Sequence, residues 1–391
     1  MTKEKAVIVG AGIAGLTAAL SLARHGIASE VHEKSPSLSE VGAGLQLSPN
    51  ASSMLDGLGL LERLSQYWNE PEAIRLVSGY SLREHASVPV GNYARQRWGA
   101  PYVVLHRADL QQVLLEAVEN EKLCRLHLNS RISEDDIAAL SSDAKLVIGA
   151  DGVWSKVSSA VADSPKARFS GNVAYRFTIP EEKSQGLLNG KAVTAFLGSN
   201  AHLVSYPLGK ERGINVVAIT AGNPSSENWQ VEMTPDRRNA MLARFAGWHP
   251  GIKVLLEKAE HVTYWPLYER LAGSWHDHRN VVLIGDAAHA MMPFAAQGAA
   301  MAIEDAVELA RLVAARPASE ALTRFTMRRT PRIKKLRQRA SLNRFAYHAS
   351  GPIKLARNIV FSLKSPESLA GDLDWIYGYR ASNTDPYSVT S

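Results

Sequence analysis

The chain has 391 residues, more than one hydrophobic core usually supports, so we expect two closely connected domains. Hydrophobic residues make up 46% and charged residues 21% of the chain, both ordinary fractions for a globular protein, and no apolar run approaches the roughly 20 residues that a membrane-spanning helix needs. Cys124 is the only cysteine, which excludes intramolecular disulfides and cysteine-based metal sites.

Charged residues at two places bear on location and partners. The segment from Met1 to Lys5 leads directly into an apolar strand without a small-residue cleavage site, so we expect no signal peptide and a cytoplasmic location. The formal net charge is +6, and between Arg324 and Arg357 basic residues recur without one Asp or Glu. This run could attract a nucleic acid, anionic lipid or anionic nucleotide. A solvated helix face is the favoured interpretation, because no nucleic-acid-binding signature accompanies the run, and we expect no nucleic-acid partner.

The elements predicted in the first part of the chain alternate between strands and helices. Short apolar runs predict buried strands, and apolar residues at helical spacing predict helices. The predicted strands are residues 5–9, 28–32 and 146–148, and the predicted helices are residues 13–25, 51–66 and 107–118. Residues 74–104 are strand-rich and irregular.

The pattern changes at residues 166–222, where Gly and Pro separate short strands and indicate a mixed or antiparallel sheet. The strands predicted there are residues 193–197, 202–206 and 214–219. Helices follow at 235–247 and 250–258, then a buried strand at 281–284 and a long helix at 299–315. The basic helical region comes next, and a turn-rich tail begins at Ser365.

A glycine-rich turn links the first strand to the first helix. Residues 10–15 match G-x-G-x-x-G directly after a predicted strand and at the start of a predicted helix, which is where this pattern indicates dinucleotide binding. Gly10 permits the tight turn, Gly12 lets the backbone approach a pyrophosphate, and Gly15 lets the helix pack on the strand. The helix N-terminus stabilises the phosphate charge. Glu33 ends the second strand, where a carboxylate accepts hydrogen bonds from ribose hydroxyls.

Further motifs in a fixed order narrow this dinucleotide site. They are residues 42–51 (Gly-Ala-Gly-Leu-Gln-Leu-Ser-Pro-Asn-Ala), 106–110, 149–156, 285–306 and 374–379 (Asp-Trp-Ile-Tyr-Gly-Tyr). At these residues the chain resembles the single-component (group A) FAD-dependent aromatic hydroxylases, in particular the salicylate, hydroxybenzoate and 6-hydroxynicotinate hydroxylase branch. Lys156 stands where the family often has Arg, and Ala290 stands where it often has Pro.

The resemblance implies FAD as cofactor and assigns residues to it. Asp286 is implied to contact the ribityl chain, Arg107 the phosphate, and Asp151-Gly152 both FAD and a transient nicotinamide. The segment from Pro293 to Ala300 is implied to face the isoalloxazine ring. The full expected set is Gly10, Gly12, Ile13, Ala14, Gly15, Glu33, Lys34, Gly44, Gln46, Arg107, Asp151, Gly152, Gly285, Asp286, Pro293, Gln297, Gly298, Ala299 and Ala300.

The expected fold class is α/β. It combines a Rossmann-like FAD-binding domain of the three-layer glutathione-reductase type with an inserted mixed β-sheet substrate domain and a C-terminal helical region. The expected segments are 1–75, 101–165 and 273–345 for the FAD-binding domain, 76–100 and 166–272 for the substrate domain, and 346–391 for the helical tail.

Candidate catalytic residues lie on the strand predicted at 202–206. His202 and Tyr206 share one face of it, and His202 could take a proton from a phenolic or hydroxypyridine hydroxyl, although a packed strand histidine is an equal alternative. Arg176 could reach the flavin or a substrate carboxylate, or be solvated. We expect a structural role for His289. His276 and His278 lack a third ligand, so we expect no metal site.

The reaction implied by the resemblance is NAD(P)H- and O₂-dependent hydroxylation of a small aromatic substrate through a flavin C4a-hydroperoxide. Only one complete G-x-G-x-x-G unit is present, so NADH or NADPH would bind transiently. Two alternatives stay open. One is a flavin oxidoreductase or epoxidase of the same fold acting on a non-aromatic substrate, and the other is a non-catalytic FAD-binding redox sensor. The sequence does not indicate the oligomeric state.

Overall fold

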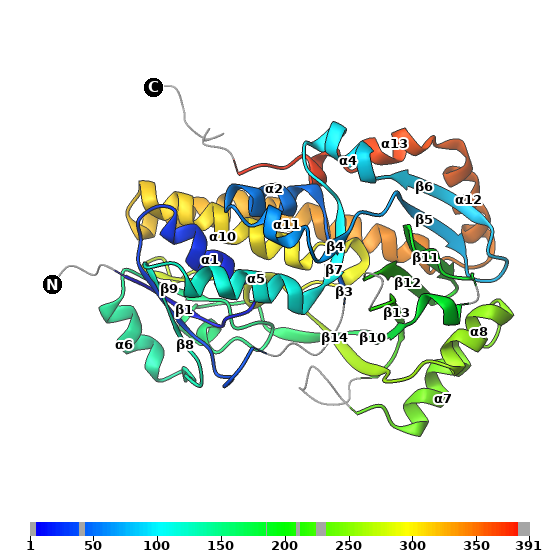
Figure 1. Cartoon of the computed structure of the whole chain (residues 1–391). Helices are drawn as coiled ribbons and strands as arrows, with labels where there is room; N and C mark the ends of the chain where they lie inside the picture. The colour runs from blue at the N-terminus through cyan, green and yellow to red at the C-terminus, as the bar shows by residue number, and fades with distance from the viewer. Residues whose placement is uncertain (1–4, 39–43, 185, 209–211, 224–231, 382–391) are drawn as a thin grey trace.

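A computed structural model describes residues 5–38, 44–184, 186–208, 212–223 and 232–381 (Figure 1). Gly42 and Ala43 of the second predicted motif lie outside these described residues, as does the start of the chain before Lys5. The described part contains no helix that is both long and apolar enough to cross a membrane.

A five-stranded parallel sheet forms the first layer, in the order β15-β9-β1-β2-β8. Its strands are β1 (Ala6–Val9), β2 (Ser29–His32), β8 (Cys124–His127), β9 (Leu146–Gly149) and β15 (Val281–Leu283). Three helices pack together beside it: α1 (Ile13–Ala23), α5 (Arg107–Glu119) and α10 (Gly298–Ala315). A short helix, α6 (Asp136–Asp143), packs beside β9. The strands and helices predicted for this part are confirmed, with ends shifted by a few residues.

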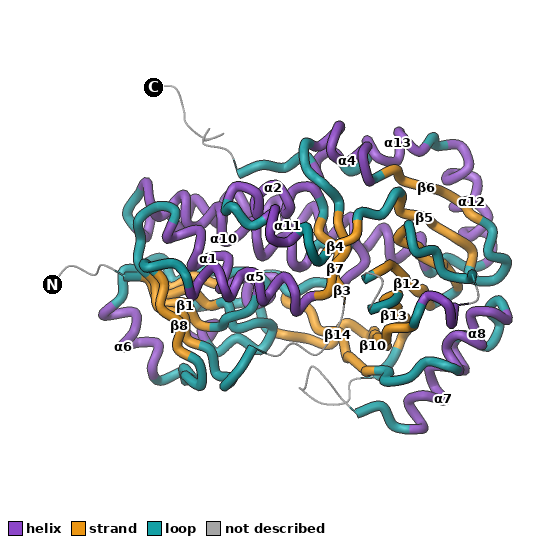
Figure 2. The backbone as a smooth tube through the Cα atoms, in the orientation of Figure 1, coloured by secondary structure: helices purple, strands orange, loops and turns teal. Residues whose placement is uncertain are grey.

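The second sheet has seven strands in the order β14-β10-β13-β12-β11-β5-β6. The sheet is mixed, because β11 pairs with β5 in parallel, whereas all the other neighbouring strands of the sheet pair antiparallel. Its strands are β5 (Ala73–Ser78), β6 (Glu84–Pro89), β10 (Ala167–Ile179), β11 (Ala192–Gly198), β12 (Ala201–Pro207), β13 (Ile214–Ala221) and β14 (Thr263–Arg270). The strands predicted at 193–197, 202–206 and 214–219 are confirmed. Figure 2 shows the two large sheets at opposite ends of the molecule.

The two faces of the seven-stranded sheet have different neighbours. One face, which carries Phe196 and Leu203, packs against α7 (Pro235–Arg244) and α8 (Pro250–Glu257) in a separate hydrophobic core. Side chains alternate along a strand, so His202 and Val204 point to the opposite face. That face looks toward the 3₁₀ turn η3 (Pro293–Ala295) and the C-terminal helices.

A small antiparallel sheet connects the two larger parts, and the elements near it differ in two details from those predicted. Its strands are β3 (Gly44–Leu47), β4 (Trp68–Asn69) and β7 (Val103–His106). The helix predicted at 51–66 is two helices, α2 (Pro49–Gly57) and α3 (Leu61–Leu64), because Gly59 takes φ +75° and ends the first. The strand-rich region 74–104 contains an additional helix, α4 (Gly91–Trp98).

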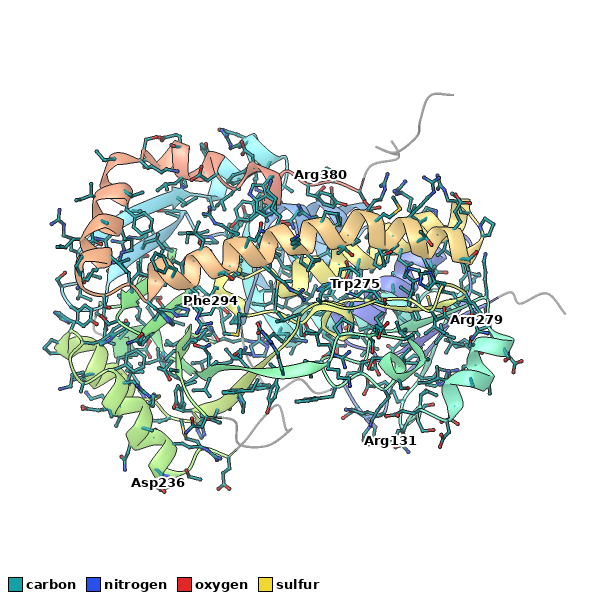
Figure 3. The ribbon with its side chains drawn as sticks, turned by 180° about the vertical axis from the view of Figure 1, so that it is seen from behind. Arg131, Asp236, Trp275, Arg279, Phe294 and Arg380 are labelled. Atoms are coloured by element: carbon teal, nitrogen blue, oxygen red, sulfur yellow. The ribbon has the colours of Figure 1, made fainter. Side chains whose placement is uncertain are left out.

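Short helices and turns complete the chain. They are α9 (Asp286–His289), η1 (Val157–Ala160) and η2 (Glu181–Ser184), followed after α10 by α11 (Ala318–Tyr347), α12 (Gly351–Leu363), α13 (Pro366–Gly371) and α14 (Asp374–Tyr377). The tail predicted as turn-rich from Ser365 is therefore partly helical. Figure 3 shows α11 crossing the back of the molecule, with Phe294 beside it. The expected α/β fold class is confirmed, and the segment boundaries of the domains stay a prediction.

The basic run on α11 is not a simple solvated face. Arg329 is fully buried and binds the carboxylates of Glu304 and Asp305 on α10. Arg332 reaches the same Glu304 at 2.6 Å and also donates to the carbonyl of Trp375 at 2.8 Å. Burying one charge of such a group without its partners costs several kcal/mol. Part of the positive charge of the run therefore holds α11 onto α10, which corrects the interpretation made from sequence.

Candidate active site

A cleft of about 370 Å³ opens at the carboxyl ends of β1, β2 and β9. Ligands of open parallel sheets bind at this edge. Most of the expected cofactor residues line it: Gly10, Gly12, Ile13, Ala14, Glu33, Lys34, Arg107, Asp151, Gly152, Asp286, Gly298 and Ala299. Residues from six separated segments of the chain therefore meet in one cleft, as the motif order predicts.

The glycine turn has the geometry that close approach to a ligand requires. Gly10 takes φ +103°, and a Cβ there would lie 2.5 Å from the carbonyl oxygen of Ala150. A Cβ on Gly15 would collide with the carbonyl oxygen of Gly10. A Cβ on Gly12 would meet nothing within 4 Å, and Gly12 lines the cleft. The three glycines therefore permit the turn, the helix packing and an open backbone surface, respectively.

Two acidic side chains are held in place at this edge. Glu33 accepts hydrogen bonds from the backbone N–H groups of Ala11 at 2.9 Å and Ser35 at 3.0 Å, which fixes its carboxylate in the cleft. One oxygen of Asp151, Oδ2, accepts from the N–H of Lys156 at 2.6 Å. Its other oxygen, Oδ1, is buried and has no hydrogen-bond partner among the described residues. Burial raises the pKa of the Asp151 carboxyl.

These features fit FAD. The orphaned Oδ1 of Asp151 needs a donor, and a cofactor hydroxyl would supply one. Four basic side chains line the same cleft, and they match the two negative charges of a diphosphate: Lys34, Arg107, Arg131 and Lys156. The Lys156 ammonium also pairs with Glu134 at 3.0 Å, so only part of its charge would be available to bind a phosphate. The donor set, the glycine surface and the α1 N-terminus together accommodate a dinucleotide.

Several expected cofactor residues lie behind or beyond the cleft. Gln297 is buried and donates to Ser48 Oγ at 2.8 Å, and the Gly285 N–H donates to Asp305 at 2.9 Å. Ala300 is fully buried beside them. Gly44 packs against Tyr206, while Gln46 and Pro293 line a second cavity. Contact of these residues with the cofactor stays a prediction.

Sequence reasoning missed one side of the cleft. His32, Ser130, Arg131 and Ile132 line it, and three of them follow β8. The residues of β8 alternate between buried and more exposed positions and include Arg125 and His127, so they lack the apolar run that predicts a buried strand. Only the position of these residues in the chain could have indicated their role. The loop that follows an edge strand of a parallel sheet lies at the same carboxyl edge as the loops after the other strands.

The second cavity, of about 460 Å³, lies between the seven-stranded sheet and the C-terminal helices. Its walls are mainly apolar and include Ile74, Leu76, Val88, Val193, Ala195, Val204, Phe294, Leu342, Tyr347, Ile353, Val360, Ile376 and Tyr377. Residues 293–296 line this cavity, and residues 298–299 line the cofactor cleft. The two sites therefore meet at one short segment, which is where the resemblance implies the isoalloxazine ring.

His202 stands at this junction. It is 1% exposed and lines the cavity, and its ring centroid lies 4.9 Å from that of Phe294. Its Nδ1 lies 2.9 Å from Nε2 of His348, which sequence reasoning did not single out. Burial lowers the pKa of His202 well below its usual value and that of His348 to about 4. Both rings are therefore neutral at neutral pH.

Tyr206 shares the face of His202 but lies farther along β12. It is buried, packs against Gly44, and is absent from the cavity lining. Burial raises the pKa of its hydroxyl, so the phenol keeps its proton at neutral pH. The guanidinium of Arg176 stacks on the ring of Trp265, 5.0 Å from its centroid. Direct substrate contact by Tyr206 or Arg176 stays a prediction.

Three basic side chains also line the mainly apolar second cavity. Arg357 donates to the carbonyl of Ala346 at 2.8 Å, and Lys364 pairs with Asp372 at 2.6 Å. Arg339 also lines the cavity, and its buried Nε has no hydrogen-bond partner among the described residues. An anionic group on a ligand could bind there.

His289 and the other two histidines singled out from sequence lie away from both cavities. His289 is buried against Trp275, and its Nε2 lies 2.6 Å from Asp305, in agreement with the structural role expected for it. His276 and His278 stack edge to face with ring centroids 4.4 Å apart.

Comparisons with known proteins agree with this geometry. The family model described as "FAD binding domain" matches residues 3–340. The chain is 36% identical to 3-hydroxybenzoate 6-hydroxylase 1 of Aquipseudomonas alcaligenes, over 95% of this chain and 97% of that protein. It is 31% identical to 6-hydroxynicotinate 3-monooxygenase of Bordetella bronchiseptica, over 79% and 82%.

Solved structures share the fold. A salicylate hydroxylase substrate complex superposes with a TM-score of 0.77 at 22% identity, covering 97% of both chains. Klebsiella pneumoniae HpxO complexed with FAD and uric acid has a TM-score of 0.78 at 22% identity, covering 94% of this chain and 95% of that one. Together with the family match and the sequence relatives, this places the chain in the family of FAD-dependent aromatic hydroxylases, which are flavoprotein monooxygenases.

Proposed function

We propose that this enzyme hydroxylates a small aromatic ring that carries both a hydroxyl and a carboxylate, using NADH or NADPH and O₂. The observation that carries the proposal is that His202 and Arg339 both line one mainly apolar cavity, which meets the cofactor cleft beside Phe294. A neutral imidazole accepts the hydroxyl proton, a guanidinium binds the carboxylate, and the apolar walls bury the ring. The names of the relatives support this class, because they describe enzymes that act on hydroxybenzoates or on 6-hydroxynicotinate.

Proton removal from the ring hydroxyl is the step assigned to the protein. In the tautomer in which Nδ1–H of His202 donates to Nε2 of His348, Nε2 of His202 keeps a lone pair for the substrate. The proton taken there can pass on through His348, which is only partly buried, toward solvent. A deprotonated hydroxyl pushes electron density into the ring and makes it a better nucleophile.

FAD, when bound and reduced by NADH or NADPH, would supply the activation of O₂, from which one oxygen atom enters the ring and the other leaves as water. Glu33, Asp151 and the four cleft cations would hold its adenosine and diphosphate parts, and Asp286 its ribityl chain. The apolar lining around His202 excludes water from the junction between the two sites, which favours hydroxylation over unproductive loss of oxygen as hydrogen peroxide. Tyr206, four residues from His202 on the same face of β12, would act from outside the cavity lining, by supporting the strand that carries His202.

The test is a panel of aromatic acids. The purified protein is examined for bound yellow flavin, and NADH and NADPH consumption is followed with hydroxybenzoates, hydroxypyridine carboxylates, and matched phenols and benzoates that lack one of the two groups. Rings with both groups should accelerate nicotinamide oxidation and yield hydroxylated product. If FAD binds and no aromatic acid accelerates nicotinamide oxidation, the proposal is wrong, and the alternatives of a non-aromatic substrate or a redox sensor gain weight.

We also propose that the enzyme works in the cytoplasm. Its single cysteine is a buried thiol, and a chain that uses no disulfides is typical of reducing compartments. Fractionation of the native host, with the protein followed by antibody, tests this location, and recovery from an extracytoplasmic fraction would contradict it.

A further inference from the structure

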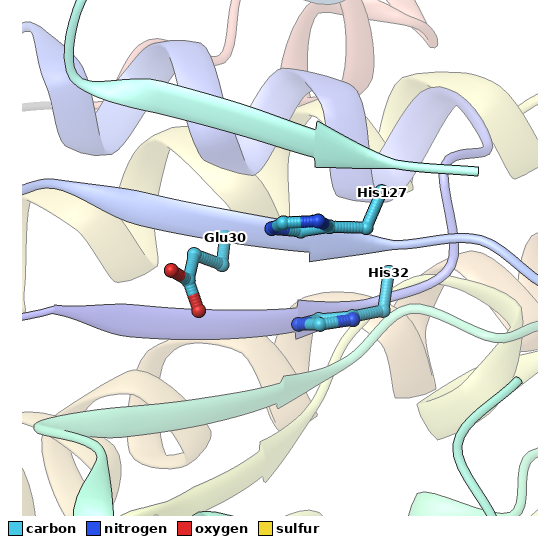
Figure 4. Close-up of side chains that lie close together, drawn as sticks. All are labelled: Glu30, His32 and His127. Carbon is cyan, nitrogen blue, oxygen red and sulfur yellow. The ribbon is translucent and has the colours of Figure 1, made fainter. Parts of the chain in front are cut away.

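Three ligand-type side chains meet on one face of the parallel sheet, away from the reaction site. Glu30 and His32 lie two residues apart on β2 and therefore share a face, and His127 on β8 is the register partner of His32. One potential ligand atom of each residue lies within 4.8 Å of those of the other two. Figure 4 shows both imidazole rings side by side, with a ring nitrogen of each directed toward the Glu30 side.

The geometry of the two rings is ordered. They stack with centroids 4.8 Å apart and an interplanar angle of 16°. Nδ1 of His32 lies 2.9 Å from Ser130 Oγ, which leaves Nε2 of His32 for another partner. Metal-binding histidines characteristically hydrogen-bond through their second nitrogen in this way, because that bond fixes the tautomer and the ring orientation.

We propose that Glu30, His32 and His127 bind a divalent transition-metal ion of the zinc class. Two imidazoles and one carboxylate are a ligand set typical of zinc, with water in the fourth position. With metal–ligand distances of about 2 Å, tetrahedral ligands lie about 3.3 Å apart, so the three groups must close by roughly 1.5 Å. His127 is exposed and can make this adjustment by rotation of its side chain.

Two basic residues lie next to Glu30, and their positive charges would weaken the binding of a metal cation. The ammonium of Lys5 lies 2.8 Å from the Glu30 carboxylate and is half exposed, so an incoming cation must displace it. Arg125 is the register partner of Glu30 on β8 and shares its face of the sheet. Cys124, by contrast, points to the opposite face, where it contacts Ser29, and is no competing ligand.

The ion would tie the edge strand β8 to β2. His32 and Ser130 also line the cofactor cleft, so metal binding and FAD binding share residues there. Any coupling between the two ligands must be reciprocal. The site was not predicted from sequence, because His127 is far from Glu30 and His32 along the chain and only strand pairing brings them together.

Calorimetric titration of the tag-free, FAD-loaded enzyme with zinc chloride tests the proposal. The wild type and His25→Ala, which removes an exposed histidine on the turn before β2, should bind one more equivalent of zinc than His127→Ala. Ser130→Ala should weaken binding of that equivalent about 10-fold. Lys5→Met should tighten it, since the competing ammonium is gone.

Equal zinc stoichiometry in the wild type and in a folded His127→Ala variant would overturn the proposal. If His127→Ala fails to fold, the Lys5→Met titration decides, because that variant keeps all three ligands. Unchanged zinc affinity in Lys5→Met would then overturn the assignment of Glu30 as a ligand. Activity need not be measured, so this result is separate from the outcome of the substrate panel.

Discussion

The two cavities of this enzyme are built in different ways. The cofactor cleft has a mixed polar and apolar lining, and turns that immediately follow buried strands supply much of it, such as Gly10 after β1 and Asp151 after β9. The second cavity is apolar, and it is closed by a sheet face on one side and by α11 to α14 on the other. Turn geometry restricts residue identity at the first site, whereas an apolar wall can be built from many residue types.

The first prediction compares two glycines of the same turn. Gly15→Ala should destabilise the protein by about 3 kcal/mol or more, because the added Cβ collides with backbone at Gly10. Gly12→Ala should leave the apoprotein stable, because nothing lies within 4 Å of the added Cβ, yet weaken FAD binding. Thermal unfolding and flavin absorbance distinguish the two effects. Equal stability of the variants would mean that the turn is not held as described.

The second prediction concerns His202 at the junction of the sites. His202→Ala should lower hydroxylation by roughly 10²- to 10⁴-fold, the usual contribution of a general base. The variant should still bind FAD, because the cofactor cleft does not include this residue. Product formation per nicotinamide consumed is measured alongside flavin content. Unchanged turnover and coupling would remove His202 from the mechanism.

The third prediction concerns the wall of the second cavity. Arg339→Met should raise KM for carboxylated rings roughly 10- to 100-fold, since a hydrogen bond to a charged group contributes about 1.5–3 kcal/mol. It should leave KM for the matching phenol nearly unchanged. Lys334→Met, on an exposed position of the same helix, is the control. Equal effects on acids and phenols would argue against carboxylate binding by Arg339.

The fourth prediction is a pH dependence of stability. The folded-state pKa of His348 is lowered to about 4, below its unfolded value, because of burial and the nearby Arg344. Its contribution to stability is thus fully present above pH 6.5 and is lost as the pH falls toward 4. At about 1.4 kcal/mol per pKa unit, reduced by solvent screening at this partly buried ring, we expect a loss of roughly 2 kcal/mol.

Chemical denaturation between pH 7 and pH 4 checks this value. Replacement of His348 by Phe should reduce the pH slope, although His202 keeps its own contribution. A slope identical to that of the wild type would show that the pair does not titrate as described.

The sequence predicted the cofactor cleft far better than the second cavity. The roles of Gly10, Gly12 and Glu33 follow from short-range rules of strand, turn and helix, and the geometry of these residues agrees with them. Arg339 and His348 could not be found in this way, because only the path of α11 across the seven-stranded sheet brings Arg339 to the second cavity and His348 beside His202. The burial of Arg329 was missed for the same reason, since its partners lie on another helix.

Helix α11 has 30 residues, about 45 Å in length, with Pro331 inside it. Proline has no N–H, so the backbone hydrogen bond between the two halves is interrupted at this point. Arg329, just before Pro331, anchors the helix to α10, while Arg339, after it, lines the second cavity, and His348 follows the end of the helix and lies beside His202. If the second cavity binds the substrate as proposed, substitutions in the later half of α11 change which ring is accepted without loss of FAD binding. In evolutionary terms, substrate preference can diverge on this scaffold without loss of the flavin.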